Sequence, residues 1–116
     1  MRVFLLLCLV FCLAFLCKGQ TQYEGVASYY GEQFHGKQTA SGQTFNQHAL
    51  TAAHPTLPFG TKIRVTNIAN NNSVVVTVND RGPYAKDRII DLSYEAARIL
   101  GYVQRGLTYV KLEIIK

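Results

Sequence analysis

Residues 61–79 read TKIRVTNIANNNSVVVTVN, and this stretch decides the fold class. In its first part, apolar Ile63 and Val65 alternate with charged or polar residues, which is typical of a strand with one buried face. Asparagines fill positions 70–72, and asparagine tolerates the left-handed backbone that tight hairpins require. The β-branched run at 73–79 predicts a returning strand. The whole stretch therefore predicts a β-hairpin.

Shorter patterns on both sides of this hairpin predict the remaining elements. Ser93 fits the N-cap of a helix that Gly101 ends. Residues 32–46 are rich in glycine and polar side chains and predict a loop, and two prolines within 54–58 forbid a helix there. We expect further strands at 25–31, 44–53 (where a turn is the alternative), 87–92 and 108–115. About six short strands with one or two short helices indicate a small, mainly β barrel rather than a parallel α/β sheet.

The first 19 residues differ in composition from the rest of the chain. Arg2 precedes an uninterrupted apolar run at 3–17, and Lys18 and Gly19 follow it. A basic start, an apolar stretch too short to span a membrane comfortably, and small residues at its exit are typical of a secretory signal. We expect residues 1–19 to be a signal peptide that is cut after Gly19, so that the protein is exported. An uncleaved N-terminal anchor is the alternative.

All three cysteines lie inside this segment, at Cys8, Cys12 and Cys17. A lipid anchor requires a small residue just before the modified cysteine, and the residues found there are Leu7, Phe11 and Leu16. The lipoprotein signal is therefore weak, although a lipid anchor stays open as an alternative to cleavage.

Removing the signal changes the overall composition. The chain of 116 residues has a net charge of +5, whereas the 97 residues after the cut carry ten basic and seven acidic side chains, a net +3. We expect a short polar lead at 20–24 and one domain at 25–116, held by its apolar core without disulfides. A charge this small, with no basic cluster, argues against nucleic acid as a partner.

Asp80 is the first candidate for chemistry, because it ends the β-branched run and precedes a Gly-Pro turn. A carboxylate at the end of a rigid strand has a fixed direction, which suits a general acid, but it can equally cap the turn by accepting backbone N–H groups. Neighbours on extended backbone point to opposite faces, so Arg81 need not contact Asp80. We expect Arg81 to be an ion-pair partner of Asp91 or of the substrate.

The histidines and Asp91 carry weaker signals. His54 follows two alanines and precedes a proline, and a lone histidine is usually structural. With His35 and His48 it shows neither HxH nor HxxxH spacing, so we expect no metal site. Asp91 lies just before the predicted helix, where a carboxylate is favoured by the helix dipole without any catalytic role.

Aromatic residues flank the polar loop. Tyr29, Tyr30, Phe34 and Phe45 lie beside glycines, and a groove there would offer aromatic faces on which sugar rings pack. Some of these rings are expected in the core instead. Tyr29 and Tyr30 are neighbours on a predicted strand, so they should point to opposite faces.

Seven motifs occur in a specific order: GVASYYG, FxGxxTASG, LTAAHPTLPFGT, VTN, NDRGPY, RIIDLS and AARILG. In this order and spacing they resemble the rare lipoprotein A family of septal ring lytic transglycosylases, over about residues 25–115. The resemblance implies a double-psi β-barrel. It also implies a lyase of the periplasm or cell envelope that cleaves peptidoglycan glycan strands, preferably peptide-free, between MurNAc and GlcNAc and leaves 1,6-anhydroMurNAc ends.

The same resemblance implies roles for individual residues. Asp80 of NDRGP would be the catalytic acid and base, and His54 of AAH would support it. We expect the substrate to contact Gln43, Tyr29, Tyr30, Phe34, Thr39, Ser41, Arg81 and Asp91. No cofactor is implied, the partner is the glycan strand, and a monomer is expected. Longer family members carry a C-terminal glycan-binding repeat domain, which we do not expect here because the sequence stops at Lys116.

Gln43 departs from the family pattern, because the residue after TASG is commonly glutamate. Hydrolases need two carboxylates, whereas an intramolecular transglycosylase can use one carboxyl group twice. The substitution argues against hydrolysis and leaves a non-catalytic, expansin-like glycan-binding module as the alternative. An acid that works near neutral pH must hold its proton firmly, which predicts that Asp80 is partly buried and away from the Arg81 side chain.

Overall fold

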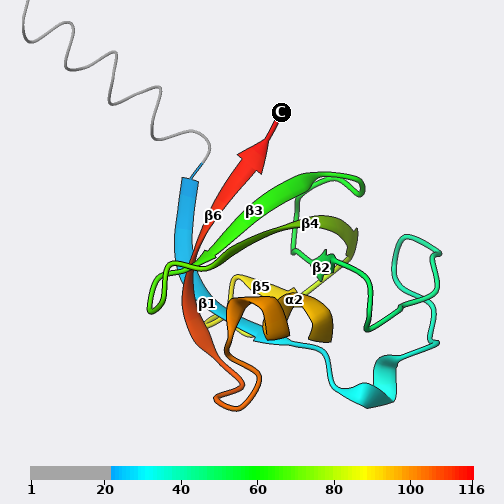
Figure 1. Ribbon diagram of the computed structural model, residues 1–116. Helices are drawn as coiled ribbons and strands as arrows, with labels where there is room; N and C mark the ends of the chain where they lie inside the picture. Colours follow the sequence, from blue (N-terminus) through cyan, green and yellow to red (C-terminus); the bar gives the residue numbers. More distant parts are fainter. Residues whose placement is uncertain (1–21) are drawn as a thin grey trace, which may run out of the picture.

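The computed structural model describes residues 22–116, so the expected signal peptide lies outside the described residues. Within this range six strands close a barrel in the order β1-β5-β2-β4-β3-β6 (Figure 1). The strands are β1 (Gln22–Tyr29), β2 (Thr51–Ala53), β3 (Lys62–Asn67), β4 (Ser73–Asp80), β5 (Ile90–Leu92) and β6 (Thr108–Ile115). A 3₁₀ turn, η1 (Glu32–Phe34), and one helix, α2 (Tyr94–Leu100), complete the domain. The expected small β-barrel is confirmed.

The predicted hairpin is confirmed as β3 and β4, which pair antiparallel from Lys62↔Thr77 to Thr66↔Ser73. Asn71 in its turn has a φ of 65°, the left-handed conformation that the asparagine run indicated. A tight turn of this kind defines the register of both strands locally. The central feature of the fold is therefore determined by neighbouring residues.

Other boundaries differ from the expected ones. Strand β1 begins at Gln22, not at residue 25, because Gln22 pairs with Glu113 of β6, and so residues 22–24 belong to the barrel rather than to a polar lead. Strand β5 covers only Ile90–Leu92, since its pairing with β1 starts at Ala27↔Ile90. Strand β2 keeps only three residues of the stretch 44–53. These limits depend on partners distant in sequence, which local patterns do not show.

Two strand pairs, β1 with β5 and β2 with β4, are parallel, and the others are antiparallel. Parallel neighbours need long crossover connections. The segment between β1 and β2, which are not neighbours in the barrel, projects beyond it (Figure 1). The mixed closed sheet agrees with the expected double-psi β-barrel.

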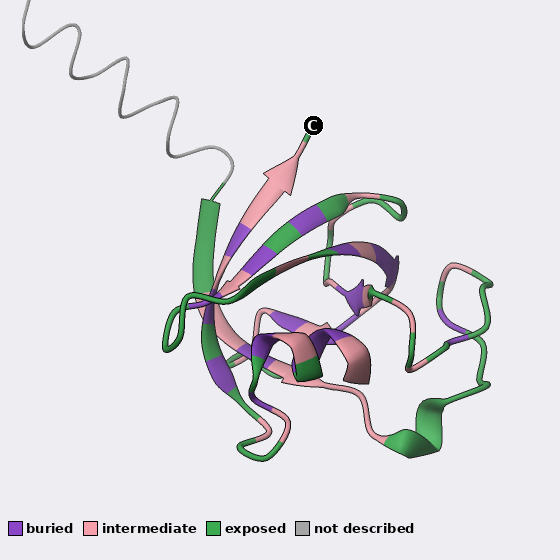
Figure 2. Ribbon diagram, in the orientation of Figure 1, coloured by how far each residue is buried: buried purple, intermediate pink, exposed green. Residues whose placement is uncertain are grey.

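The barrel interior is filled by alternate strand residues, seen as buried and exposed bands along β3 in Figure 2. Ile63 and Val65 of β3 are fully buried against partners on β4 and β6. Helix α2 adds Ala96, Ala97 and Leu100 to the same core and packs against β4 and β1. One continuous apolar core therefore holds the ends of the strands in place.

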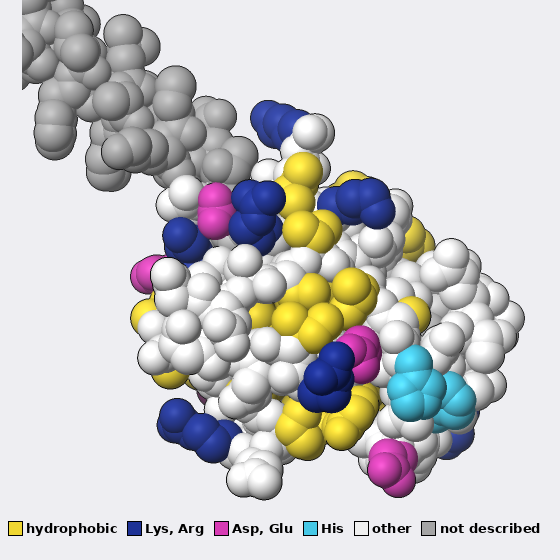
Figure 3. Space-filling model, viewed as in Figure 1, with side chains coloured by type: hydrophobic (Ala, Val, Ile, Leu, Met, Phe, Trp, Pro, Cys, Tyr) yellow, Lys and Arg dark blue, Asp and Glu magenta, His cyan; other side chains and the backbone are white. Residues whose placement is uncertain are grey.

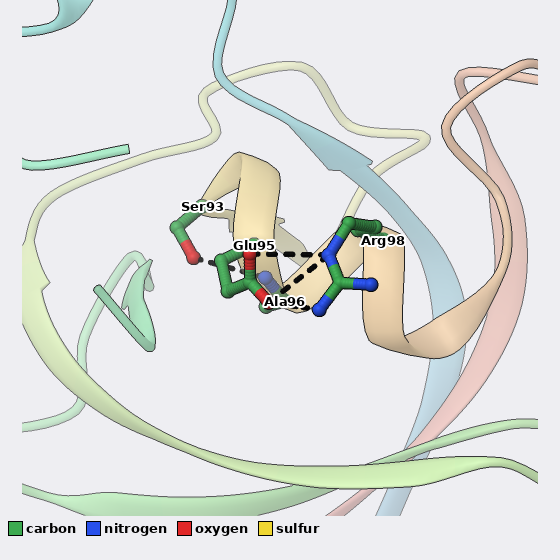
Figure 4. A network of polar contacts seen from close by, with 4 residues as sticks. All are labelled: Ser93, Glu95, Ala96 and Arg98. Carbon is green, nitrogen blue, oxygen red and sulfur yellow. Dashed lines mark hydrogen bonds and ion pairs between the residues drawn. The ribbon is translucent and has the colours of Figure 1, made fainter. Parts of the chain in front are cut away.

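The ends of α2 agree with the sequence. The Ser93 hydroxyl accepts a hydrogen bond from the Ala96 N–H at 3.3 Å, and Gly101 ends the helix with a φ of 81°. Glu95 and Arg98 form an ion pair on the outer face (Figure 4). No helix within residues 22–116 is long and apolar enough to cross a membrane.

Candidate active site

Three strand ends bring two carboxylates to one side of the barrel. Ala53 at the end of β2 pairs with Asp80 of β4, the neighbouring strand on one side, and with Asp91 of β5, the neighbouring strand on the other side. Both carboxylates line one groove of about 680 Å³. Barrel closure thus unites Asp80 with Asp91, and the groove is the candidate active site.

The Asp80 carboxylate is held by three hydrogen-bond donors. Its Oδ1 accepts from the backbone N–H of Ala40 at 2.8 Å and of Arg81 at 2.9 Å, and its Oδ2 accepts from the Tyr30 hydroxyl at 2.6 Å. The Arg81 bond is the turn cap considered above, whereas the other two donors come from the segment after β1. Asp80 is half-buried, as expected. Its carboxylate therefore has one defined direction into the groove.

The Tyr30 side chain, which donates to Asp80, is itself held in place by aromatic packing. Its ring stacks on buried Phe45 at a centroid distance of 4.4 Å and meets the edge of Phe34 at 5.8 Å. Burial and the hydrogen bond to Asp80 raise the pKa of Tyr30, so the phenol keeps its proton and remains a donor.

Tyr29 turns the other way, which confirms the expected opposite directions. Its hydroxyl donates to the Val103 carbonyl at 2.8 Å, and its ring packs edge-on against Tyr94 and Tyr102. Tyr29 also borders the groove, but its ring and hydroxyl are engaged with the core side.

The Arg81 side chain points away from Asp80. Its guanidinium donates to the carbonyls of His54 at 3.2 Å and Leu57 at 2.8 Å and lies 4.1 Å from the Phe59 ring centroid. Within residues 22–116 no Lys or Arg side chain forms an ion pair with Asp80. The expected separation of this carboxylate from the Arg81 guanidinium is confirmed.

The expected ion pair between Arg81 and Asp91 is wrong. Arg88 takes that place, with its Nε 3.4 Å from the Asp91 Oδ1, and the Ser28 hydroxyl donates to the same carboxylate oxygen. Ser93, not Asp91, caps the helix. Sequence reasoning missed Ser28 because the Ser28↔Asp91 pairing exists only in the closed barrel. Arg88 lies three residues before Asp91, a local signal that was overlooked.

His54 adjoins Asp80 through the backbone but not through its ring. The His54 N–H donates to the Asp80 carbonyl at 3.1 Å. Its Nδ1 accepts from the N–H groups of Thr56 at 3.2 Å and Leu57 at 3.1 Å, and its ring lines a second cavity of about 270 Å³. Burial and the charge of Arg81 lower the pKa of His54, so the imidazole is neutral near pH 7.

The three polar residues expected from the TASGQ motif lie beside the groove rather than in its lining. Thr39 is buried with its hydroxyl 2.8 Å from that of Ser41, and exposed Gln43 accepts from the Asn79 amide at 3.2 Å. The Ser41 N–H also donates to the Asn79 carbonyl. These contacts attach the loop to β4, and the loop in turn presents the Ala40 N–H to Asp80.

Two exposed aromatic side chains border the groove. Phe34 was expected there and is 43% exposed, whereas Tyr84 is 84% exposed and was missed. The available signal for Tyr84 was its position at the end of the NDRGPY motif. Such rings offer apolar faces to a sugar polymer.

A pair of histidines lies on another part of the surface. The rings of His35 and His48 have centroids 5.7 Å apart, and Figure 3 shows two histidine side chains in contact on the viewed face. Within the described part of the chain no group of three or more His, Cys, Asp or Glu side chains is placed to hold a metal ion.

Comparison with known proteins agrees with this geometry. The family model described as lytic transglycolase matches residues 22–112. A probable endolytic peptidoglycan transglycosylase RlpA of Synechocystis is 56% identical over 79% of this chain and 29% of its own length. The RlpA proteins of Campylobacter jejuni and Rickettsia felis are each 54% identical, over 79% and 78% of this chain. The chain spans 34% and 41% of the lengths of these two relatives.

Solved structures support the fold alone. The Streptomyces papain inhibitor superposes with a TM-score of 0.68 at 22% identity, covering 84% of this chain and 96% of the inhibitor. An expansin of Clavibacter michiganensis superposes with a TM-score of 0.67 at 20% identity, covering 82% of this chain and 50% of the expansin. With the family match over residues 22–112 and the closed six-stranded barrel, the chain belongs to the lytic transglycolase family, as a double-psi β-barrel similar to the RlpA proteins.

Proposed function

We propose that the chain is an endolytic transglycosylase that cleaves peptidoglycan glycan strands between MurNAc and GlcNAc without water. The observation that carries the proposal is the Asp80 carboxylate, half-buried in an open groove, held by three donors and turned away from the Arg81 guanidinium. The RlpA relatives, named as peptidoglycan transglycosylases, support the substrate class.

The proposed reaction uses one carboxyl group twice. Asp80 gives its proton to the glycosidic oxygen as the bond from that oxygen to MurNAc C1 breaks. The C6 hydroxyl of the same MurNAc then attacks C1 and returns its proton to Asp80, which forms the 1,6-anhydro ring and restores the acid. Oδ1 already accepts two backbone N–H groups, so Oδ2, beside Tyr30, is the oxygen that exchanges the proton.

The surroundings favour this reaction over hydrolysis. A hydrolase needs a second carboxylate as nucleophile or base. Asp91 lies in the same groove, but its carboxylate is engaged by Arg88 and Ser28. This arrangement suits Asp91 to binding substrate hydroxyl groups. Gln43 cannot titrate, and its amide oxygen already accepts a hydrogen bond from Asn79.

The test is to incubate the protein with peptide-free glycan strands and to search by mass spectrometry for anhydromuramoyl ends. We expect these ends from the natural chain and a loss of about 10²- to 10⁴-fold in Asp80→Asn, the usual contribution of a general acid. Asp87→Asn, which changes an exposed acid outside the groove, is the matched control. Absence of anhydro ends, or an equal yield of them from Asp80→Asn, would refute the proposed transglycosylase activity. Glycan binding without cleavage would favour the binding module.

We further propose that the protein is exported to the periplasm or cell envelope, where this substrate lies, and acts there as a monomer. The support is the apolar segment at 3–17 with its basic start. N-terminal sequencing of the protein recovered from the envelope fraction should begin at Gln20. Recovery from the cytoplasm with Met1 intact would contradict export.

A further inference from the structure

The second cavity, of about 270 Å³, has mainly apolar walls and three polar aliphatic or imidazole side chains. The polar groups are His54, Thr56 and Arg88, and the walls are formed by Tyr23, Pro55, Leu57, Ile89 and Leu112. Arg88 also lines the groove with Asp80, so the two spaces are adjacent. Sites for whole drug-sized ligands begin at about 300 Å³, and this cavity therefore suits one substituent of a sugar rather than a ring.

The contacts of His54 determine which ring nitrogen carries its proton. Nδ1 accepts two backbone N–H groups, from Thr56 and Leu57, so it cannot carry a hydrogen. In the neutral imidazole the proton is therefore on Nε2. Within residues 22–116 Nε2 makes no hydrogen bond, and it is not sealed from solvent. His54 thus presents a neutral N–H donor to the cavity and cannot act there as a base.

Arg88 contributes little unbalanced charge to this cavity. Its Nε is buried 3.4 Å from the Asp91 carboxylate, which offsets the guanidinium charge. A neutral acceptor with an apolar part fits these surroundings better than a second carboxylate, which would compete with Asp91 for the same cation.

We propose that this cavity binds an acetamido group of the glycan strand whose backbone lies in the neighbouring groove. The carbonyl oxygen accepts from His54 Nε2, and the methyl group packs on Leu57, Ile89 and Leu112. The inference rests on the proposed substrate class, and it assigns His54 to substrate binding rather than to proton transfer. Lactyl groups of MurNAc also combine a methyl group with an oxygen acceptor, so the experiment must separate the two.

The experiment compares two neutral β-1,4-linked hexasaccharides by calorimetric titration of the full chain carrying Asp80→Asn, which prevents turnover. Chitohexaose has acetamido groups, and cellohexaose has hydroxyl groups in their place. We expect chitohexaose to bind about tenfold more tightly, the effect of one hydrogen bond and one buried methyl group. Equal affinities would overturn the proposal.

His54→Asn provides the decisive variant. The Asn Oδ1 can still accept the Thr56 and Leu57 N–H groups, but the Nε2–H donor is lost. We expect the chitohexaose preference to fall to about twofold or less, whereas His48→Asn, a change of an exposed histidine outside this cavity, keeps it. An unchanged preference in His54→Asn would assign the acetamido contact elsewhere and refute the proposal.

Two further readouts separate the possible outcomes. Nitrogen-15 NMR should show His54 protonated on Nε2, with that resonance shifted by chitohexaose and not by cellohexaose; a proton on Nδ1 would contradict the proposal. A gain in binding affinity that depends on His54 and is seen with peptide-free peptidoglycan strands, but not with chitohexaose, would identify the lactyl group as the occupant of the cavity instead. Failure of the cleavage assay would leave these binding results unaffected, so the two proposals fail independently.

Discussion

The hairpin of β3 and β4 and the segment between β1 and β2 contribute to Asp80 in different ways. The hairpin consists of directly paired strands with fully buried side chains such as Ile63, and it ends in the Asp80 backbone. Residues 30–50 contain short turns with few buried side chains, yet they supply the Tyr30 hydroxyl and the Ala40 N–H. The barrel therefore positions Asp80, the proposed catalytic residue, and an irregular segment orients its carboxylate.

The largest effect should follow from a cavity in the hairpin. Ile63→Ala removes a fully buried side chain, and we expect it to lower the free energy of unfolding by about 2–5 kcal/mol. Chemical denaturation measures this loss. Val75→Ala, on the exposed face of the same hairpin, should change stability by about 0.5 kcal/mol or less. Similar losses of unfolding free energy in the two variants would contradict the burial of the Ile63 side chain in the core.

Tyr30→Phe examines the irregular segment. The change keeps the stacked ring but removes the hydroxyl donor to Asp80 Oδ2, which we expect to cost about 1 kcal/mol of stability and to slow cleavage about tenfold. Rates of anhydro-end formation measure the change in cleavage. Tyr109→Phe, at an exposed strand residue, should leave the rate unchanged.

Asn71→Ala examines the hairpin turn. Asn71 has a φ of 65°, and alanine in the left-handed region costs about 1 kcal/mol. We expect that loss in denaturant unfolding with no change in cleavage rate, because the turn lies at the opposite end of β4 from Asp80. Asn71→Gly should retain stability. A slower cleavage rate in a folded Asn71→Ala protein would contradict the division between the two regions.

The smallest effect concerns the pH dependence of stability through His54. Its pKa in the folded protein lies below the unfolded value of about 6.5, so folding favours the neutral ring. This contribution is present above the unfolded pKa and is lost as the pH falls through the folded pKa. Unfolding free energies measured from pH 7 downward should decline less in His54→Asn than in the natural chain. An identical decline in both would disprove this assignment.

Local patterns predicted the elements that local interactions determine. The hairpin turn and the helix ends at Ser93 and Gly101 depend on residues a few positions apart, and they were found correctly. The starts of β1 and β5 were misplaced because each depends on pairing with a distant strand. The expected Arg81–Asp91 ion pair was wrong for a related reason, since the Arg81 guanidinium donates to carbonyls of a loop far away in sequence. The Arg88–Asp91 ion pair joins residues three positions apart and was a local signal that was overlooked.

By itself the sequence determined the alternation of buried residues, the hairpin, the helix caps and the position of Asp80 at a strand end. Only the tertiary structure decided that the side chains of Asp80 and His54 face two different cavities. The physical reason is that side-chain direction follows from hydrogen-bond donors. Tyr30 and Ala40 reach Asp80 through barrel closure, whereas the backbone after Pro55 turns the His54 ring away.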